Sequence, residues 1–116
     1  MTYNLEGRTT KFGEEILFLA KSLEKNIINN SLISQIIRSG TSIGANYFEA
    51  NGAASRKDFK NKICICKKEA RETKYWPELI AKANSNHKDK CRILWKEAQE
   101  LTLIFSKIVL TIDKGK

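Results

Sequence analysis

The sequence contains few residues that break helices and few of the alternating patterns that are typical of strands. Its 116 residues include one proline and six glycines, and β-branched residues seldom recur at every second position. With 41% hydrophobic residues, the chain can bury one core but hardly two. We therefore predict an all-α protein with a single domain over residues 1–116.

Long apolar runs are also missing. The chain has no run of about 18 apolar residues, which is the length needed to span a bilayer. Its first ten residues also lack the apolar core of a signal peptide. The three cysteines are an odd number, which implies no disulfide framework and fits small buried hydrophobic side chains in a reducing compartment. The sequence therefore predicts a cytoplasmic protein without a membrane partner.

Histidine and cysteine are too scarce for a recognisable metal site. Cys64 and Cys66 have only Cys91 to join them, and residues two apart on a helix point to different sides. Tetrahedral zinc needs four ligands. A di-iron bundle needs Glu-x-x-His pairs, whereas Glu69-x-x-Glu72 has the spacing without the histidine. We expect no metal and no cofactor.

The same scarcity argues against an enzyme. His87 is the only histidine and falls in a predicted loop, so it cannot supply both members of an acid/base pair. No glycine-rich phosphate loop follows a strand. Glu49, Glu69 and Glu72 could form a catalytic group of carboxylates, but carboxylates on helices more often form salt bridges. We therefore expect no catalytic residues.

Apolar residues recur at steps of three and four in four segments, about residues 10–26, 32–51, 56–83 and 88–112. The last segment has the cleanest repeat: Cys91, Leu94, Ala98, Leu101, Phe105, Ile108 and Ile112. Between the first two segments, Asn29 to Ser31 indicates a turn, with Ser31 as the N-cap of the second helix. Links this short join antiparallel helices. We predict an antiparallel up-and-down four-helix bundle.

Two places within these helices break local rules. Gly40 and Gly44 lie in the middle of the second helix, where each costs about 1 kcal/mol relative to alanine. We keep that helix unbroken, because its apolar seam stays in register and the two glycines let a neighbouring helix approach closely. Pro77 lacks the amide that would bond to Thr73, so we expect the third helix to bend between Thr73 and Trp76 and then continue.

The third helix carries most of the net charge. Ser55 and Asp58 form a capping-box pattern that predicts its start after Ser55. Residues 56–74 hold eight basic and three acidic side chains, in a chain of net charge +8. Six cations share the side away from the apolar stripe: Lys57, Lys60, Lys67, Lys68, Arg71 and Lys74. Such a row attracts RNA or DNA through phosphate contacts. The alternative is a merely solubilising surface, because charge alone gives no base readout.

A third side of the same helix mixes carboxylates with large apolar groups: Ile65, Glu69, Glu72, Trp76 and Leu79. A solvated surface seldom has isoleucine, tryptophan and leucine in one row. We interpret this band as a subunit interface, in which lysine or arginine side chains pair with the carboxylates. The alternative is a wide core stripe in a compact monomer.

Several of these residues together resemble a known family. The pattern comprises Ser42-Ile43-x-x-Asn46, Glu49, Ser55-x-x-Asp58-Phe59 and Lys68-Glu69-Ala70-x-Glu72-Thr73-x-Tyr75-Trp76. It is similar to the four-helix bundle proteins encoded in intervening sequences of bacterial 23S ribosomal RNA genes, and the likeness covers most of the chain. A second, architectural likeness is to the accessory bundle proteins of diversity-generating retroelements, which form basic pentameric barrels that bind nucleic acid and a reverse transcriptase.

The resemblance implies a bundle that assembles as a ring-like homopentamer and has no established enzymatic activity. It gives structural and interface roles, rather than catalytic ones, to the matching residues Ser42, Asn46, Glu49, Asp58, Glu69, Glu72 and Trp76. Two positions depart from the family pattern. Ala50 stands where many members have glycine, which leaves the end of the second helix open by a residue or two. Pro77 stands where an aliphatic residue is usual, which suggests a local bend.

The sequence thus favours a non-catalytic oligomer whose basic row binds RNA or DNA without sequence preference. A second hypothesis is a protein-interaction scaffold that presents apolar residues to a partner such as a nucleic-acid enzyme. A third is a mobile-element-associated protein with no nucleic-acid role. Charge reversal at Lys67 and Arg71 would abolish RNA retention under the first hypothesis and leave the protein complex intact under the second.

Overall fold

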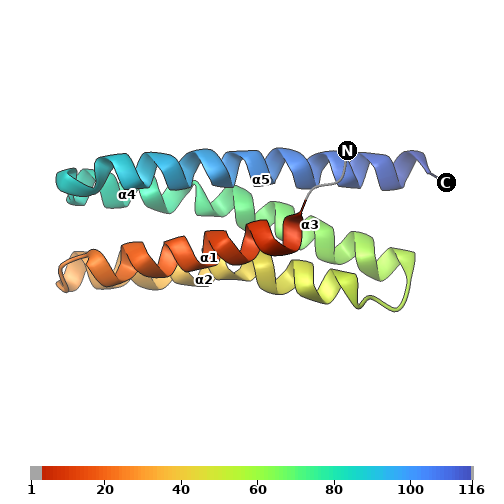
Figure 1. Ribbon diagram of the computed structural model, residues 1–116, viewed down its shortest axis with the longest axis horizontal. Coiled ribbons are helices and arrows are strands. Elements are labelled where there is room, and N and C mark those ends of the chain that lie inside the picture. Colours follow the sequence, from red (N-terminus) through yellow and green to blue (C-terminus); the bar gives the residue numbers. More distant parts are fainter. Residues whose placement is uncertain (1–3, 116) are drawn as a thin grey trace.

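The computed structural model describes residues 4–115, which form helices and no β-strand. The elements are α1 (Leu5–Ser22), α2 (Ile27–Asn51), α3 (Arg56–Thr73), α4 (Tyr75–Ala83), the 3-10 turn η1 (Ser85–His87) and α5 (Lys88–Lys114). Because α4 continues α3 beyond a bend, the chain forms an antiparallel up-and-down four-helix bundle (Figure 1). The predicted fold class is confirmed. Within the described range, no helix is long and apolar enough to cross a membrane.

Polar side chains cap three of the helix starts. The Asn26 side chain accepts a hydrogen bond from the Asn29 amide at 2.8 Å, and the Ser55 hydroxyl accepts one from the Asp58 amide at 3.0 Å. Asn4 caps α1 in the same way through the amide of Gly7. Each bond satisfies one of the backbone donors that a helix leaves unpaired at its start. The start predicted after Ser55 is correct.

The predicted bounds of the first two helices are wrong. The helix expected at 10–26 is Leu5–Ser22, and the helix expected at 32–51 is Ile27–Asn51. Ser31 is therefore not an N-cap, and the predicted turn at residues 29–31 lies inside α2. The last helix runs to Lys114, two residues beyond the predicted end at 112.

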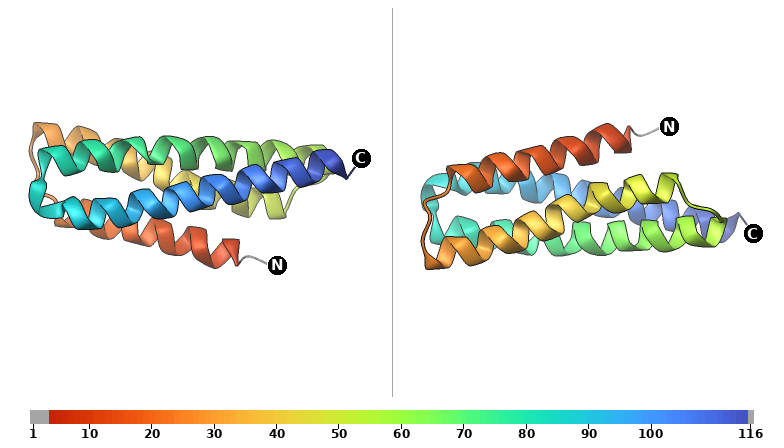
Figure 2. Two further views of the ribbon diagram at one scale, coloured as in Figure 1. Left: turned by 90° about the horizontal axis from the view of Figure 1, so that it is seen from above. Right: turned by 90° about the horizontal axis from the view of Figure 1, so that it is seen from below.

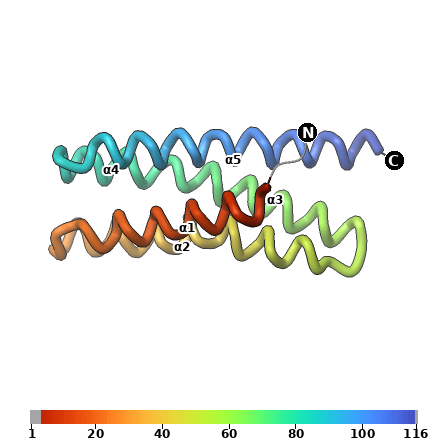
Figure 3. Tube along the Cα trace, in the orientation of Figure 1, coloured from red at the N-terminus to blue at the C-terminus, as the bar shows by residue number. Residues whose placement is uncertain are grey.

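A buried pair of amide side chains explains the error at residues 29–31. Asn29 is 1% exposed, and its Nδ2 donates to the Glu24 carbonyl at 2.8 Å and to Asn84 Oδ1 at 3.0 Å. In return, Asn84 Nδ2 donates to Asn29 Oδ1 at 2.9 Å. The trace in Figure 3 shows the α1–α2 turn and the α4–α5 turn at the same end of the bundle. The Asn29–Asn84 pair therefore joins the two turns.

The third helix bends where the sequence predicted. The regular helix stops at Thr73 and resumes at Tyr75, and Lys74 between them keeps helical dihedral angles of φ −66° and ψ −30°. Pro77 falls in the first turn of α4, where its missing amide removes no hydrogen bond that this turn needs. The segment expected as one bent helix over 56–83 is thus α3 followed by α4 with little change of phase.

Glycines let α1 and α2 approach closely, as predicted, and α2 is unbroken. A Cβ atom added to Gly40 would lie 2.9 Å from Ile16 Cγ1, and one added to Gly44 would lie 3.4 Å from Thr9 Oγ1. On its other side, α1 is joined to α5 by ion pairs of Arg8 with Glu97 and of Glu15 with Lys90. Figure 2 shows α1 diverging from the other helices toward its N-terminal end.

The predicted apolar seams form the core between the helices. In α3, Ile63, Cys66, Ala70 and Thr73 are buried before the bend, and Phe59 packs against the core while partly exposed. The α5 seam is fully or nearly fully buried from Cys91 to Phe105 and only half-buried at Ile108. The largest wholly buried side chains include Ile16, Leu19, Ile36, Ile43, Ile63, Ile80, Leu94, Leu101 and Phe105.

Candidate nucleic-acid interface

The predicted basic residues form one row on the outer side of α3. Positions 57, 60, 64, 67, 71 and 74 are spaced by three and four residues, so they lie along one line of a helix with 3.6 residues per turn. Lys68 lies beside this line, and Cys64 interrupts it. We call the six cations of this surface, Lys57, Lys60, Lys67, Lys68, Arg71 and Lys74, the α3 basic row.

Two members of the α3 basic row are held by α5. The Lys60 ammonium pairs with the Asp113 carboxylate, and the hydrogen bond between them raises the pKa of Lys60. Lys74 Nζ donates to Gln99 Oε1 at 2.6 Å and lies 5.5 Å from the centre of the Trp95 ring. The row therefore borders the groove between α3 and α5.

The remaining four members have no ion-pair partner within residues 4–115: Lys57, Lys67, Lys68 and Arg71. All four are exposed. A surface hollow of about 540 Å³ lies among Lys67, Lys68 and Arg71, with Cys64 and Glu72 completing its wall. Unpaired cations around a hollow produce a concentrated positive potential that attracts anions.

The mixed band of α3 and α4 is half-buried in a single chain, at Ile65, Glu69, Glu72, Trp76 and Leu79. Arg38 of α2 pairs with the carboxylates of both Glu69 and Glu72. Trp76 Nε1 also donates to Glu72, at 3.2 Å. The same chain thus supplies a cation for the two carboxylates, and burial of the band against a second copy stays a prediction.

The other residues that the resemblance singles out act locally or between neighbouring helices. Ser42 and Asn46 donate to carbonyls one turn back in α2, at 2.6 and 2.8 Å. Glu49 pairs with Lys62 of α3 at 2.6 Å, which joins α2 to α3 near their connecting loop. Asp58 contributes its amide to the cap of α3. These contacts fit structural roles.

The three thiols lie in different environments. Cys66 and Cys91 are buried, and burial raises the pKa of Cys66 to about 12 and that of Cys91 to about 11. Both therefore stay protonated at neutral pH and are poor nucleophiles. Cys64 is exposed, contrary to the expectation that all three are buried. No group of three or more potential metal ligands occurs in the part of the chain that the structure describes.

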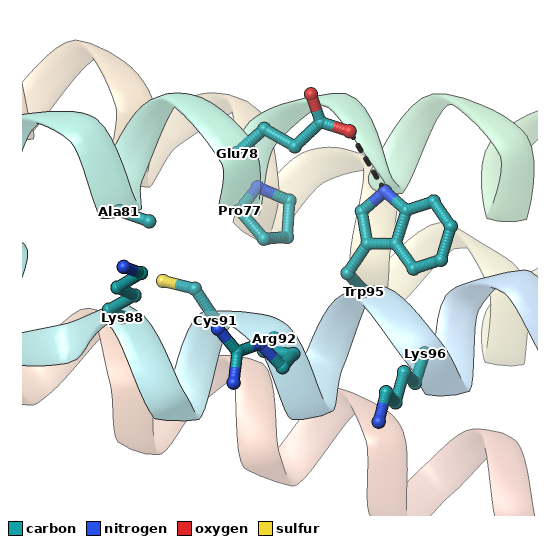
Figure 4. A pocket seen from close by; sticks show the side chains of 8 residues that line it. All are labelled: Pro77, Glu78, Ala81, Lys88, Cys91, Arg92, Trp95 and Lys96. Atoms are coloured by element: carbon teal, nitrogen blue, oxygen red, sulfur yellow. Dashed lines mark hydrogen bonds between the residues drawn. The ribbon is translucent and has the colours of Figure 1, made fainter.

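A pocket of about 390 Å³ lies between α4 and α5 (Figure 4). Its apolar lining comes from Pro77, Ala81, Cys91 and the ring of Trp95. Trp95 Nε1 donates to Glu78 Oε1 at 3.0 Å, which fixes the indole at one end of the pocket. Three cations one turn apart on α5 complete the lining: Lys88, Arg92 and Lys96.

The pocket could not be predicted from the sequence. Neither Trp95 nor the cations near it belong to the apolar repeat of the last helix or to the predicted basic row. The signal was present in the spacing, because Lys88, Arg92 and Lys96 recur every four residues around a tryptophan. The apolar wall comes from Pro77 and Ala81 on another helix, and helical periodicity within α5 cannot reveal that partner.

Comparisons with known proteins agree with these observations. A family model described as 23S rRNA-intervening sequence protein matches residues 5–107. A crystal structure from Bacteroides thetaiotaomicron, of a protein with unknown function from the S23 ribosomal protein family, has a TM-score of 0.79 and 33% sequence identity. That match covers 90% of this chain and 97% of the other. No curated protein matches the chain significantly. The chain therefore belongs to the family of 23S rRNA-intervening sequence proteins.

Proposed function

We propose that the protein is a cytoplasmic, non-catalytic homo-oligomer that binds RNA or DNA without sequence preference through the α3 basic row. The observation that carries this proposal is the set of four exposed cations without ion-pair partners within residues 4–115: Lys57, Lys67, Lys68 and Arg71. Phosphate groups would replace the water and counterions around these side chains. The energy of such contacts depends on charge and spacing, so the row would accept many sequences.

The described part of the chain offers few groups that are suited to catalysis. The thiols of Cys66 and Cys91 are buried and held protonated, and the carboxylates of Glu69 and Glu72 both pair with Arg38. The family comparisons name no reaction. We therefore assign a binding role and no chemical step.

Oligomerisation would place several basic rows on one assembly. The proposed contact surface consists of Glu49, Ile65, Glu69, Glu72, Trp76 and Leu79, and a pentamer follows from the family resemblance. In one chain, five of these six residues are half-buried beside the basic row, namely all except the exposed Glu49, and this partial exposure supports the proposed contact. Repeated rows raise affinity by avidity without any new kind of contact.

A charge-reversal experiment tests the binding proposal. The double variant Lys67→Glu, Arg71→Glu should bind a fluorescently labelled RNA at low salt much more weakly than the unaltered protein, by at least about tenfold. The matched control is Lys11→Glu, Lys21→Glu, which changes the net charge equally at exposed positions of α1. If both variants lose affinity equally, only net charge matters and the assigned surface is wrong. If the unaltered protein does not bind at low salt, the proposal is wrong.

A protein-interaction scaffold is the second candidate. Large apolar side chains outside the basic row are exposed, including Ile27 at 87% and Phe48 at 73%. Isolated exposed apolar residues are common, but values this high at large residues on two parts of α2 favour a protein partner. Under this reading the Lys67→Glu, Arg71→Glu variant would retain a co-purifying protein, and Phe48→Ala would release it. A mobile-element protein without a nucleic-acid role would show neither effect.

A further inference from the structure

We propose that the nucleic acid is single-stranded and that one of its bases is held in the α4–α5 pocket against Trp95, an inference that rests on the proposed nucleic-acid function. The pocket and the α3 basic row adjoin, because Lys74, the last cation of the row, lies 5.5 Å from the centre of the Trp95 ring that lines the pocket. Together they provide cations for phosphates and an aromatic wall for a base, which is the combination that binds single strands without sequence preference.

The α3 basic row lines up with the pocket because the chain keeps its helical phase between α3 and α4. Lys74 keeps helical dihedral angles, so the line of the α3 basic row continues into α4 at Glu78 and Ala81. The facing line on α5 runs through Arg92, Trp95 and Gln99. Two hydrogen bonds tie these lines together, from Lys74 to Gln99 at 2.6 Å and from Trp95 to Glu78 at 3.0 Å. The basic row therefore leads directly to the pocket.

The pocket itself suits a base with a phosphate beside it. Its lining is apolar at Pro77 and Cys91, which are both buried, and aromatic at Trp95, which is half-buried. A volume of about 390 Å³ lies in the range of sites for small ligands. Lys88 and Arg92 line the α5 side of the pocket (Figure 4) and have no ion-pair partner within residues 4–115.

The position of the charges gives the bound strand an orientation. Glu78 lies on the α4 side of the pocket and would repel a phosphate, whereas Lys88, Arg92 and Lys96 lie on the α5 side. Lys74, above the Trp95 ring, is the next cation toward the α3 basic row. The backbone would therefore follow α5 past the pocket and cross near Lys74 to α3.

A duplex cannot use the pocket in this way, because its bases are stacked on one another and paired inside the helix. Single strands can turn a base outward onto an aromatic side chain, and each such contact contributes about 1–3 kcal/mol. An exposed row of cations alone would bind both forms. Preference for the single strand is therefore the property that separates this inference from the proposed function.

Fluorescence titration tests the inference, because the chain has two tryptophans and only Trp95 lines the pocket. We expect a twelve-nucleotide oligothymidine to quench the emission and to bind more tightly than a duplex of equal length. Trp95→Phe should abolish most of the quenching and keep most of the affinity. Trp95→Ala should weaken oligothymidine binding by roughly 5- to 150-fold and leave duplex binding nearly unchanged.

Two controls make the outcomes distinct. Phe18→Ala removes an exposed aromatic ring of α1 that does not line the pocket, and it should change neither quenching nor affinity. Polyglutamate has charge without bases and should not quench Trp95. If duplex and single strand bind equally without quenching, the inference fails and the proposed function stands. If polyglutamate quenches as strongly as oligothymidine, base stacking is refuted. If no nucleic acid binds, both proposals fail.

Discussion

Replacing Asn29 with alanine should destabilise the bundle by about 2–4 kcal/mol. The side chain is 1% exposed and makes three hydrogen bonds, with the Glu24 carbonyl at 2.8 Å and with the two ends of the Asn84 amide at 3.0 and 2.9 Å. Each buried polar group that loses its partner costs about 1–3 kcal/mol. The Glu24 carbonyl and Asn84 Oδ1 both lose one. Such a loss is a large fraction of the free energy of unfolding of a typical domain, which is about 5–15 kcal/mol.

Urea unfolding followed by circular dichroism measures the effect. With an m-value of about 1–3 kcal/mol/M, the midpoint of Asn29→Ala should fall by about 1–2 M. The matched control is Asn30→Ala, at the exposed neighbouring position, and should lie within about 0.5 kcal/mol of the unaltered protein. All variants are compared at one protein concentration, because oligomerisation makes the midpoint depend on it.

A double-mutant cycle separates the Asn29–Asn84 pair from the rest of the site. Asn84→Ala alone breaks the same two reciprocal bonds, so the double variant should cost less than the sum of the single variants. We expect a coupling energy of at least about 1 kcal/mol. A coupling below about 0.5 kcal/mol would refute the claim that this pair joins the two turns at one end of the bundle.

Two further predictions concern the faces of α1. Gly40→Ala should destabilise the protein by about 1–2 kcal/mol, because the added Cβ would lie 2.9 Å from the wholly buried Ile16. Gly13→Ala should instead stabilise the protein by about 0.5–1 kcal/mol, because its added Cβ would make an ordinary contact at 4.0 Å. Equal urea midpoints for the two variants would contradict this pair of predictions. The hydrogen bond from Lys90 lowers the pKa of Glu15 below its ordinary value of 4.5. The Glu15–Lys90 pair therefore stabilises the protein fully when the pH is above 4.5, and this stabilisation is lost as the pH falls through the lowered pKa of Glu15. Glu15→Gln should accordingly lower the melting temperature at pH 7 but not at pH 2, and an equal decrease at both would contradict the assignment.

Local signals in the sequence predicted much of the fold. The start of α3 followed from the Ser55 cap, and the bend before Pro77 followed from its missing amide, because both effects act within one helical turn. The start of α2 was missed because asparagine-rich sequence normally indicates a turn. At Asn29 that preference is overridden by bonds to Asn84, which is 55 residues away in sequence.

For the candidate site, too, features within one helix could be predicted and contacts between helices could not. The α3 basic row could be predicted because its spacing belongs to one helix. The sequence could not tell which cations are free, since Asp113 and Gln99 of α5 engage Lys60 and Lys74. It also could not show that Arg38 of α2 pairs with two carboxylates of the mixed band. Contacts between helices decide these points, and periodicity within a helix does not contain them.

The salt dependence of RNA binding is the most direct test of the central claim. The dissociation constant of the unaltered protein for a labelled RNA is measured from about 50 to 200 mM monovalent salt. If the four unpaired cations of the α3 basic row each neutralise one phosphate, the affinity should fall with a log–log slope of about −3 or steeper. A slope near zero would contradict the claim that this row binds the phosphate backbone.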